Sequence, residues 1–333
     1  MKPSSPQPSH RRTPVSSTTP DTPHGLDSGV RRNDEILLAF DNVAFRYPDG
    51  NVGLDGCSLA IRRGSRNALI GANGAGKTTL FQHANGLFRP QSGILRHDGE
   101  ALDYSRAGLR RLRSEVGLVF QNPDQQLFSA SVREDVSFGP LNLGLDVDTV
   151  RRRVADALKA VGMEACADRP VHNLSFGQKK RVCIAGVLAM EPRLLILDEP
   201  MAGLDHAMRA ELLAVLDGLH ARGITLLLAT HDIDFAYRWA DAIHLMAAGR
   251  CIASFAATDL ADDPANAAAM RQAGIPMPGV IELQRRLAAC GCFDESLPDS
   301  PPHARSLAEL IERLNAPRAE AVAPMKTPLR RTV

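Results

Sequence analysis

The chain has 333 residues, of which 44% are apolar and 23% charged, a composition typical of a globular protein with one large or two modest cores. Lys and Arg total 39 and Asp and Glu total 38, so the formal charge of +1 gives no electrostatic reason to expect a nucleic-acid partner. No apolar run approaches the roughly 18 residues that a membrane-spanning helix needs. The six cysteines follow no disulfide-framework spacing, which favours a reducing cytosol.

Residues 1–34 contain six Pro, six Ser and four Thr, and almost no large apolar side chains. Such a segment buries too little apolar surface to offset the entropy lost on ordering. It also lacks the apolar core of a secretory signal, and its prolines oppose an amphipathic transit helix. We therefore predict a disordered leader over residues 1–34 and a globular domain from residue 35.

Short strands separated by turn residues follow the leader, and they predict an antiparallel β layer ahead of a glycine-rich stretch. Tyr47 closes one of these strands beside a turn. Its ring is placed either to stack on an adenine or to serve as a half-buried strand aromatic, and the local pattern does not separate the two. The predicted strands are residues 36–40, 43–47, 57–61 and 66–70.

Residues 71–79 read Gly-Ala-Asn-Gly-Ala-Gly-Lys-Thr-Thr and match the pattern G-x-x-x-x-G-K-[ST] between an apolar strand and a helix-compatible run. The glycines let backbone N–H groups point at phosphate oxygens, at the positive end of the following helix. We expect Lys77 on the β- and γ-phosphates and the Thr78 hydroxyl on Mg²⁺. The predicted ATP-binding residues of this stretch are Gly71, Asn73, Gly74, Ala75, Gly76, Lys77, Thr78 and Thr79.

Polar residues follow the ends of three later apolar runs. The strand predicted over 116–120 ends at Gln121, whose amide is placed to reach Mg²⁺ or the attacking water. The run 194–197 ends in Asp198 and Glu199, and two carboxylates closing a buried strand are costly without a cation. We expect Asp198 to face Mg²⁺ and Glu199 to face a water molecule. A further buried strand, 224–229, leads to His231.

Residues from 122 to about 178 are helix-rich by pattern and are interpreted as a helical insert. At its end, Ser175 is a natural helix N-cap, and Gly177 permits close backbone approach. Together with Gln178 they form a second helix N-terminus suited to an anion. Taken alone, the same motif is more typical of a capped helix that binds no ligand.

The motifs resemble, in kind and order, those of the nucleotide-binding subunits of ATP-binding-cassette proteins, over roughly residues 36 to 260. The resemblance implies an α/β fold, namely a P-loop NTPase core whose mixed sheet carries an antiparallel β layer and a helical subdomain at about 122–178. The domain would span 35–262. Phe176, Met201 and His206 depart from commoner residues. The resemblance rests on Tyr47, the phosphate loop, Gln121, residues 174–178, residues 197–199, residues 202–205 and His231.

Residues 121–128 and 134–144 further resemble the ATPase of energy-coupling-factor importers, especially the cobalt and nickel uptake type. This implies a second ATPase subunit, identical or paralogous, and integral membrane transporter subunits, with the chain held peripherally on the cytoplasmic face of the inner membrane. The solute would be cobalt, nickel or a vitamin. Asp124, Leu127 and Phe128 would contact the membrane subunit.

The resemblance also implies that two ATP molecules lie between the phosphate loop of one copy and the Ser175 helix of the other. Glu199 would polarise the water, while His231 and Gln121 would sense the γ-phosphate and Lys77 would offset its charge. Thr78, Asp198 and Gln121 would serve Mg²⁺. The residues contributed across the subunit boundary would be Ser175, Gly177 and Gln178, and Asp205 would also bind ATP.

Two alternative functions remain open at the level of sequence. The first is a soluble cassette ATPase that acts on DNA or ribosomes. Such proteins typically carry a long coiled-coil insertion, and none fits between Gln121 and residue 174. The second is an ATPase without a transport role.

Amphipathic runs at 280–287 and 306–314 predict a C-terminal helical extension over 263–315, followed by a mobile tail at 316–333. The close pair Cys290 and Cys292 has only His303 nearby, so we expect no metal site there.

Overall fold

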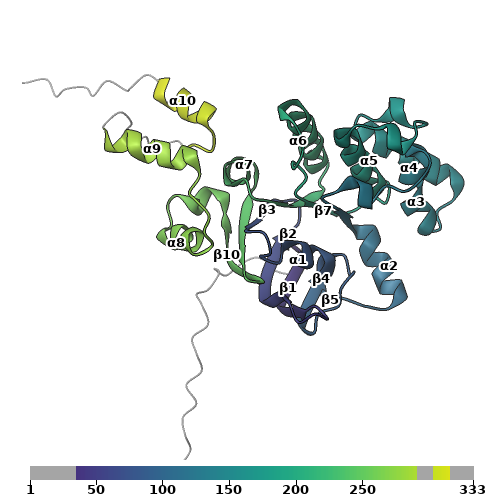
Figure 1. The fold of residues 1–333 in the computed structure, drawn as a ribbon, viewed down its shortest axis with the longest axis horizontal. Coiled ribbons are helices and arrows are strands. Elements are labelled where there is room, and N and C mark those ends of the chain that lie inside the picture. The colour runs from purple at the N-terminus through teal and green to yellow at the C-terminus, as the bar shows by residue number, and fades with distance from the viewer. Residues whose placement is uncertain (1–34, 291–302, 316–333) are drawn as a thin grey trace, which may run out of the picture. The chain divides into compact units, whose positions relative to one another are not determined.

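The computed structural model describes residues 35–290 and 303–315. The leader predicted over 1–34 and the tail predicted over 316–333 lie outside the described residues, as does Cys292. Two β-sheets and the helices around them make up the described part of the chain (Figure 1).

The first sheet is antiparallel, with strand order β2-β1-β4-β5. The two strands predicted over 36–40 and 43–47 are one strand, because a β-bulge near Asn42 (φ 50°) absorbs extra residues without ending the pairing with β2. The layer also takes β4 from beyond the glycine-rich stretch, whereas the sequence predicted the layer only ahead of that stretch. Its strands are β1 (Ile36–Arg46), β2 (Val52–Arg62), β4 (Ser92–His97) and β5 (Glu100–Ala101).

The second sheet has the order β10-β9-β3-β8-β7-β6, and all its neighbours pair in parallel except β10 with β9. The strand predicted at 66–70 belongs here as β3, not to the antiparallel layer. Every residue of β7 and β8 is buried, as expected for parallel strands covered on both faces. The strands are β3 (Arg66–Gly71), β6 (Val116–Val119), β7 (Leu194–Asp198), β8 (Thr225–Thr230), β9 (Ala242–Ala247) and β10 (Arg250–Ala256).

Some helices follow strands of the second sheet, one lies directly before β6, and the others lie in or at the end of the predicted insert. In Figure 1, α3, α4 and α5 gather together at one side of the sheets. Within the insert, Val150, Val154 and Leu158 of α4 are buried, which confirms the apolar spacing seen in the sequence. The helices up to residue 239 are α1 (Lys77–Ala84), α2 (Arg106–Glu115), α3 (Val132–Asn142), α4 (Val147–Ala160), α5 (Phe176–Leu188), α6 (His206–Ala221) and α7 (Ile233–Trp239).

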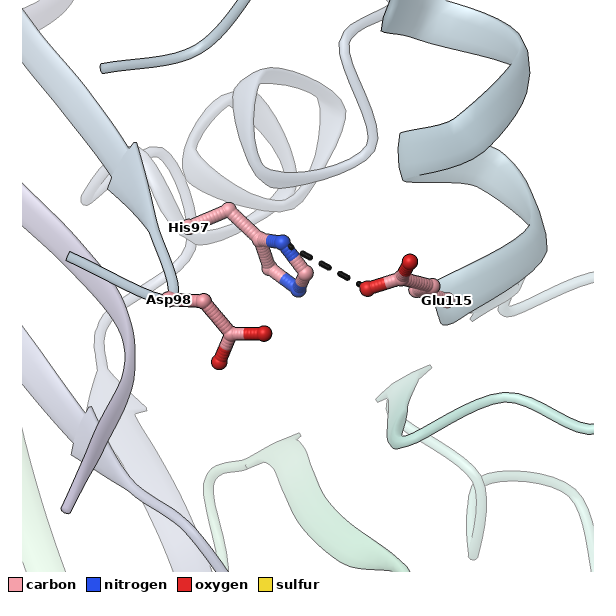
Figure 2. Close-up of side chains that lie close together, drawn as sticks. All are labelled: His97, Asp98 and Glu115. Atoms are coloured by element: carbon pink, nitrogen blue, oxygen red, sulfur yellow. Dashed lines mark ion pairs between the residues drawn. The ribbon is translucent and has the colours of Figure 1, made fainter. Parts of the chain in front are cut away.

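A polar cluster ties the turn after β4 to the end of α2 (Figure 2). In the part of the chain that the structure describes, only His97, Asp98 and Glu115 bring three potential metal-ligand atoms within 4.8 Å of one another. Arg63 and Arg193 pair with Asp98, and Arg193 also lies 3.5 Å from Glu115. Because arginines already neutralise both carboxylates, we interpret the cluster as an ion-pair network rather than a cation site.

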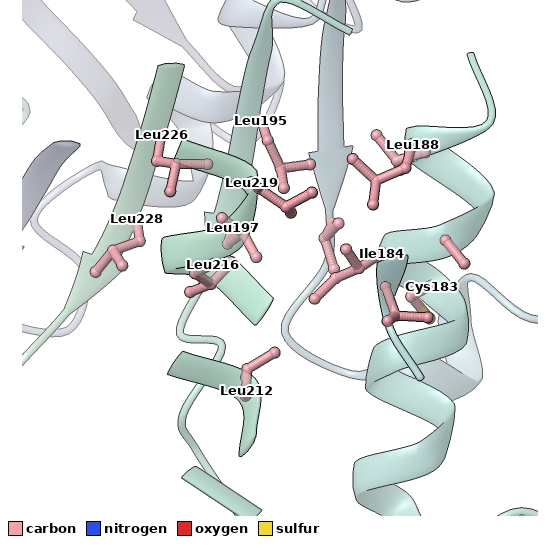
Figure 3. Packing of buried hydrophobic residues seen from close by; sticks show 14 of the residues in the cluster. Cys183, Ile184, Leu188, Leu195, Leu197, Leu212, Leu216, Leu219, Leu226 and Leu228 are labelled. Carbon is pink, nitrogen blue, oxygen red and sulfur yellow. The ribbon is translucent and has the colours of Figure 1, made fainter. Parts of the chain in front are cut away.

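Two buried apolar clusters lie on opposite faces of the second sheet, and alternate residues of β7 and β8 feed them. Figure 3 shows the first cluster, where leucines of these two strands face leucines of α6 and the apolar side of α5. The intervening residues Leu194, Ile196 and Leu227 enter the second cluster, beneath the antiparallel sheet. Strands β7 and β8 are thus enclosed between two cores, whereas the edge strand β10 is partly exposed along its length.

Three helices close the described chain: α8 (Pro264–Gln272), α9 (Gly279–Ala289) and α10 (Leu307–Asn315). The last two confirm the amphipathic runs predicted at 280–287 and 306–314. Met270 and Ile281 join the first apolar cluster, so α8 and α9 pack on the same core as the second sheet. Among residues 35–290 and 303–315, no helix combines the length and apolarity needed to cross a membrane.

Candidate functional site

The glycine-rich loop links the end of β3 to the start of α1, the position that the sequence predicts for a phosphate cradle. Gly74 and Gly76 have φ of 80° and 103°, a region that favours glycine. A Cβ on Gly76 would also lie 2.6 Å from the carbonyl oxygen of Gly53. The loop conformation therefore needs glycine at residue 76 for two independent reasons.

Lys77 is buried at the first turn of α1. Its Nζ donates hydrogen bonds to the carbonyl oxygens of Gly71, at 2.7 Å, and Ala72, at 3.2 Å. The ammonium therefore sits across the mouth of the loop, beside the N-terminal end of a helix with no acidic residue in its first turn. Both features place positive charge where a phosphate would bind.

Thr78 and Asp198 meet beside the loop, where the Thr78 hydroxyl donates to Oδ2 of Asp198 at 2.7 Å. Burial raises the pKa of Asp198, while the hydrogen bond from Thr78 and the charge of Lys77 oppose that rise. A buried carboxylate and a hydroxyl are hard oxygen donors of the kind that Mg²⁺ prefers. The donor set thus fits a magnesium ion.

Glu199 follows Asp198 directly and has φ of 45°, an uncommon conformation for a residue with a side chain. Its Oε2 lies 3.1 Å from Nδ1 of His231, which follows the end of β8. The Glu199 side chain is only 12% exposed, whereas that of His231 is 77% exposed. Strain of this kind is typical of functional sites, because the surrounding structure must hold it in place.

One cavity of about 550 Å³ brings most of the predicted residues together. Gly71 is not among its lining residues and contributes through its carbonyl to Lys77. Sequence reasoning missed four lining positions: Asn51, Val52, Gly53 and Ala202. The predicted residues that line the cavity are Tyr47, Asn73, Gly74, Ala75, Gly76, Lys77, Thr78, Thr79, Gln121, Asp198, Glu199 and His231.

Gly53 carried a signal that the sequence analysis did not use. A glycine inside a strand often marks a close backbone approach, and a Cβ at this position would lie 2.8 Å from Thr79 and 3.0 Å from Tyr47. Tyr47 itself donates or accepts a 2.8 Å hydrogen bond with the Thr79 hydroxyl and packs edge-on against Phe45. Tyr47, directly after the end of β1, is therefore both a half-buried aromatic and part of the cavity wall.

The predicted residues of the Ser175 helix do not reach this cavity. Ser175, Gly177, Gln178 and Asp205 instead line a second cavity of about 310 Å³. The N-cap prediction is confirmed: the Ser175 hydroxyl accepts from the backbone N–H of Gln178, and Oε1 of Gln178 accepts from the N–H of Ser175. Asp205 caps α6 by accepting from the N–H of Met208.

The segment predicted to contact a membrane subunit begins at a short 3-10 helix, Pro123–Gln125. Asp124 already pairs with Lys179, at 2.7 Å, although its side chain is 59% exposed. Leu127 packs against the first apolar cluster, and Phe128 is 65% exposed with its ring edge-on to Phe138. Both phenylalanines border a third, largely apolar cavity of about 610 Å³.

Comparisons with known proteins agree with this geometry. Residues 54–202 match the family model described as ABC transporter. A putative ABC transporter ATP-binding protein of Streptomyces coelicolor is 47% identical over 83% of this chain and 95% of its own length. The energy-coupling factor transporter ATP-binding protein EcfA3 of Clostridium perfringens is 49% identical over 66% of this chain and 77% of its own length.

Solved structures give the same result. The chain resembles cbiO1 of Clostridium perfringens, described as part of the ABC transporter complex cbiONQ, with a TM-score of 0.64 and 44% identity over 75% of this chain and 99% of that one. It also resembles a dimeric ATP-binding cassette in a post-hydrolysis state with ADP and Pi, with a TM-score of 0.60 and 25% identity over 66% of this chain and 99% of that one. The chain therefore belongs to the ABC transporter family, among its energy-coupling-factor ATP-binding proteins, and is an ATP-hydrolysing subunit.

Proposed function

We propose that this subunit works as a pair, with each of two ATP molecules held between the first cavity of one copy and the Ser175 helix of the other. One observation carries the proposal. The predicted nucleotide residues divide between two separate cavities of the same chain, each of which holds only part of a nucleotide site. The partner is a second copy or a paralogue, and twofold pairing lets each half complete the other.

Within a composite site, we infer that the loop N–H groups and Lys77 hold the phosphates and that Thr78, Asp198 and Gln121 hold Mg²⁺. A bound Mg²⁺ would neutralise charge on the β- and γ-phosphate oxygens. Glu199 orients the attacking water and accepts its proton, and His231, 3.1 Å from Glu199, faces the γ-phosphate. Catalysis then rests on positioning and electrostatic stabilisation rather than on a covalent intermediate.

We further propose that the subunit powers uptake of cobalt, nickel or a vitamin through integral membrane subunits, on the cytoplasmic face of the inner membrane. The proposal is supported by the relative cbiO1, which is described as part of the ABC transporter complex cbiONQ. Residues 122–128 connect Gln121 to Phe128 at the border of the apolar cavity, so this segment would pass a movement of Gln121 at the γ-phosphate to the cavity. Because Asp124 is already paired with Lys179, we assign the main contact to Phe128, with Leu127 behind it.

The test is Phe128→Asp in the complete complex with its membrane subunits. We expect ATP binding to stay unchanged while co-purification with the membrane subunit and solute uptake fall, because a charge placed in an apolar contact is costly. Val147→Asp is the matched control, since Val147 is equally exposed, at 67%, but does not border the cavity. Full assembly and uptake in Phe128→Asp would show that Phe128 does not contact the membrane subunit. If the wild-type ATPase never associates with a membrane subunit, the alternative of an ATPase without a transport role is favoured.

A further inference from the structure

Lys180, on the second turn of α5, is almost fully buried, at 3% exposure. Its Nζ donates to three backbone carbonyls, those of Pro200 at 2.7 Å, Ala202 at 2.8 Å and Glu199 at 3.3 Å. A buried ammonium is costly unless its three donors are satisfied. Here all three hydrogen bonds go to one short stretch of backbone, residues 199–202, directly after β7.

That stretch carries the catalytic end of the first cavity. Glu199 and Ala202 both line the cavity, and Glu199 holds its carboxylate there from a backbone with φ of 45°. A conformation of this kind persists only where neighbouring contacts over-determine it. The three hydrogen bonds from Lys180 supply such contacts from outside the stretch.

Phe176 lies one turn earlier on α5, and its ring covers the Lys180 ammonium. Its ring lies 5.2 Å from the Lys180 ammonium, a cation–π distance, and a Cβ on Gly203 would lie 3.0 Å from it. Phe176 stands where the commoner signature has glycine. Its ring thus covers both Lys180 and Gly203, and burial lowers the pKa of Lys180 to about 8 although Glu199 and Cys183 oppose the shift.

We propose that Lys180 is a positioning residue, which acts through the backbone of residues 199–202 to hold the Glu199 carboxylate in its reactive place. The proposal rests on the proposed function, because α5 also carries Ser175 and Gly177 into the site of the partner subunit.

The experiment is a double-mutant cycle between Lys180→Met and Glu199→Gln, measured as kcat, KM and ATP affinity of the complete subunit. Lys180→Met should lower kcat about 10- to 100-fold, as expected for a misplaced catalytic group, with ATP affinity changed less than about two-fold. In the Glu199→Gln background, the same substitution should have almost no further effect on kcat, because Lys180 acts through Glu199. Lys159→Met, on the exposed side of α4, is the control and should match the wild type.

Two results would overturn the assignment: wild-type kcat in Lys180→Met, or an equal loss of kcat in both backgrounds, which would indicate a general structural role. If Lys180→Met does not fold, Lys180→Gln, which keeps two donors, enters the same cycle and the same two results decide. A failure of the proposed function gives a different result. Wild-type turnover in Glu199→Gln alone would show that Glu199 is not catalytic, whatever kcat is measured for Lys180→Met.

Discussion

The two cavities that hold the predicted nucleotide residues are built in different ways. The first collects residues from the β1–β2 turn, the glycine-rich loop and the ends of β6, β7 and β8. The second is mainly the N-terminus of α5 facing that of α6, and its Ser175 and Gln178 already satisfy each other's backbone donors. The first cavity contains two buried ionisable groups, Lys77 and Asp198, whereas the second is a self-capped helix end; under the proposed pairing, the nucleotide held by the partner's loop would bring charge to it.

The largest expected effect comes from Glu199 in the first cavity. Glu199→Gln should keep ATP binding but slow hydrolysis by at least ~10²-fold, because a positioned acid–base group is lost while the side-chain shape is kept. The variant should accumulate as an ATP-bound dimer, seen by size-exclusion chromatography with light scattering. A wild-type turnover rate would show that the first cavity does not contain the catalytic base.

Lys77 tests whether the first cavity binds the phosphates at all. Lys77→Ala should weaken ATP binding by about 1.5–3 kcal/mol, the usual value of hydrogen bonds to a charged group, or roughly 10- to 100-fold in Kd. Isothermal titration calorimetry measures this directly, and Lys159→Ala serves as an exposed control of equal charge change. Unchanged affinity in Lys77→Ala would argue against the phosphate assignment.

The scaffold under the first cavity carries a pH-sensitive group. His244 on β9 is buried, bonded to Ser254 and to Asn67 on β3, and burial lowers its pKa to about 4. Since the folded pKa lies below the unfolded value near 6.5, protonation favours unfolding, and stability is lost as pH falls from ~6.5 toward ~4. We expect about 2 kcal/mol lower unfolding free energy at pH 5 than at pH 7 from this group.

Urea unfolding of the wild type and of His244→Gln at both pH values measures the effect. The variant should lose about 2 kcal/mol of the difference between the two pH values, while His83 and His97, whose pKa burial also lowers, account for a further part. His172→Gln, at an exposed position, should keep the full difference. Equal pH dependence in all three proteins would place the sensitive group elsewhere.

The smallest expected effect tests the second cavity by complementation. Lys77→Ala disables the first cavity and Ser175→Arg disables the second. In a mixed dimer both mutations therefore fall in the same composite site, and the other composite site carries neither. After exchange at equal amounts, about a quarter of wild-type ATPase should return, because half of the dimers are mixed and half of their sites are intact. No recovery at any ratio, with subunit exchange verified by a labelled subunit, would contradict a site shared between chains.

Much of the first cavity was predictable because its residues stand at strand ends in a recognisable order. Parallel strands carry their carboxyl ends to one edge, so Gln121, Asp198 and His231 had to meet near the loop once β6, β7 and β8 were identified. Asn51 and Val52 were not predictable in this way, because nothing in their local pattern distinguishes them from ordinary turn and strand residues. Their place in the cavity depends on how the antiparallel sheet lies over α1, whereas Ala202 lies in the turn after β7, where its carbonyl accepts from Lys180.

The sequence by itself determined the glycine-rich loop, the capped helix at Ser175 and the buried strands, because each depends on residues close together in the chain. Only the tertiary structure decided that the first predicted strands are one bulged strand, that Asp124 pairs with Lys179, and that Lys180 reaches the backbone after Glu199. These features need residues far apart in sequence to approach within hydrogen-bond distance. Local propensity carries no information about such approaches, since they follow from the packing of whole elements.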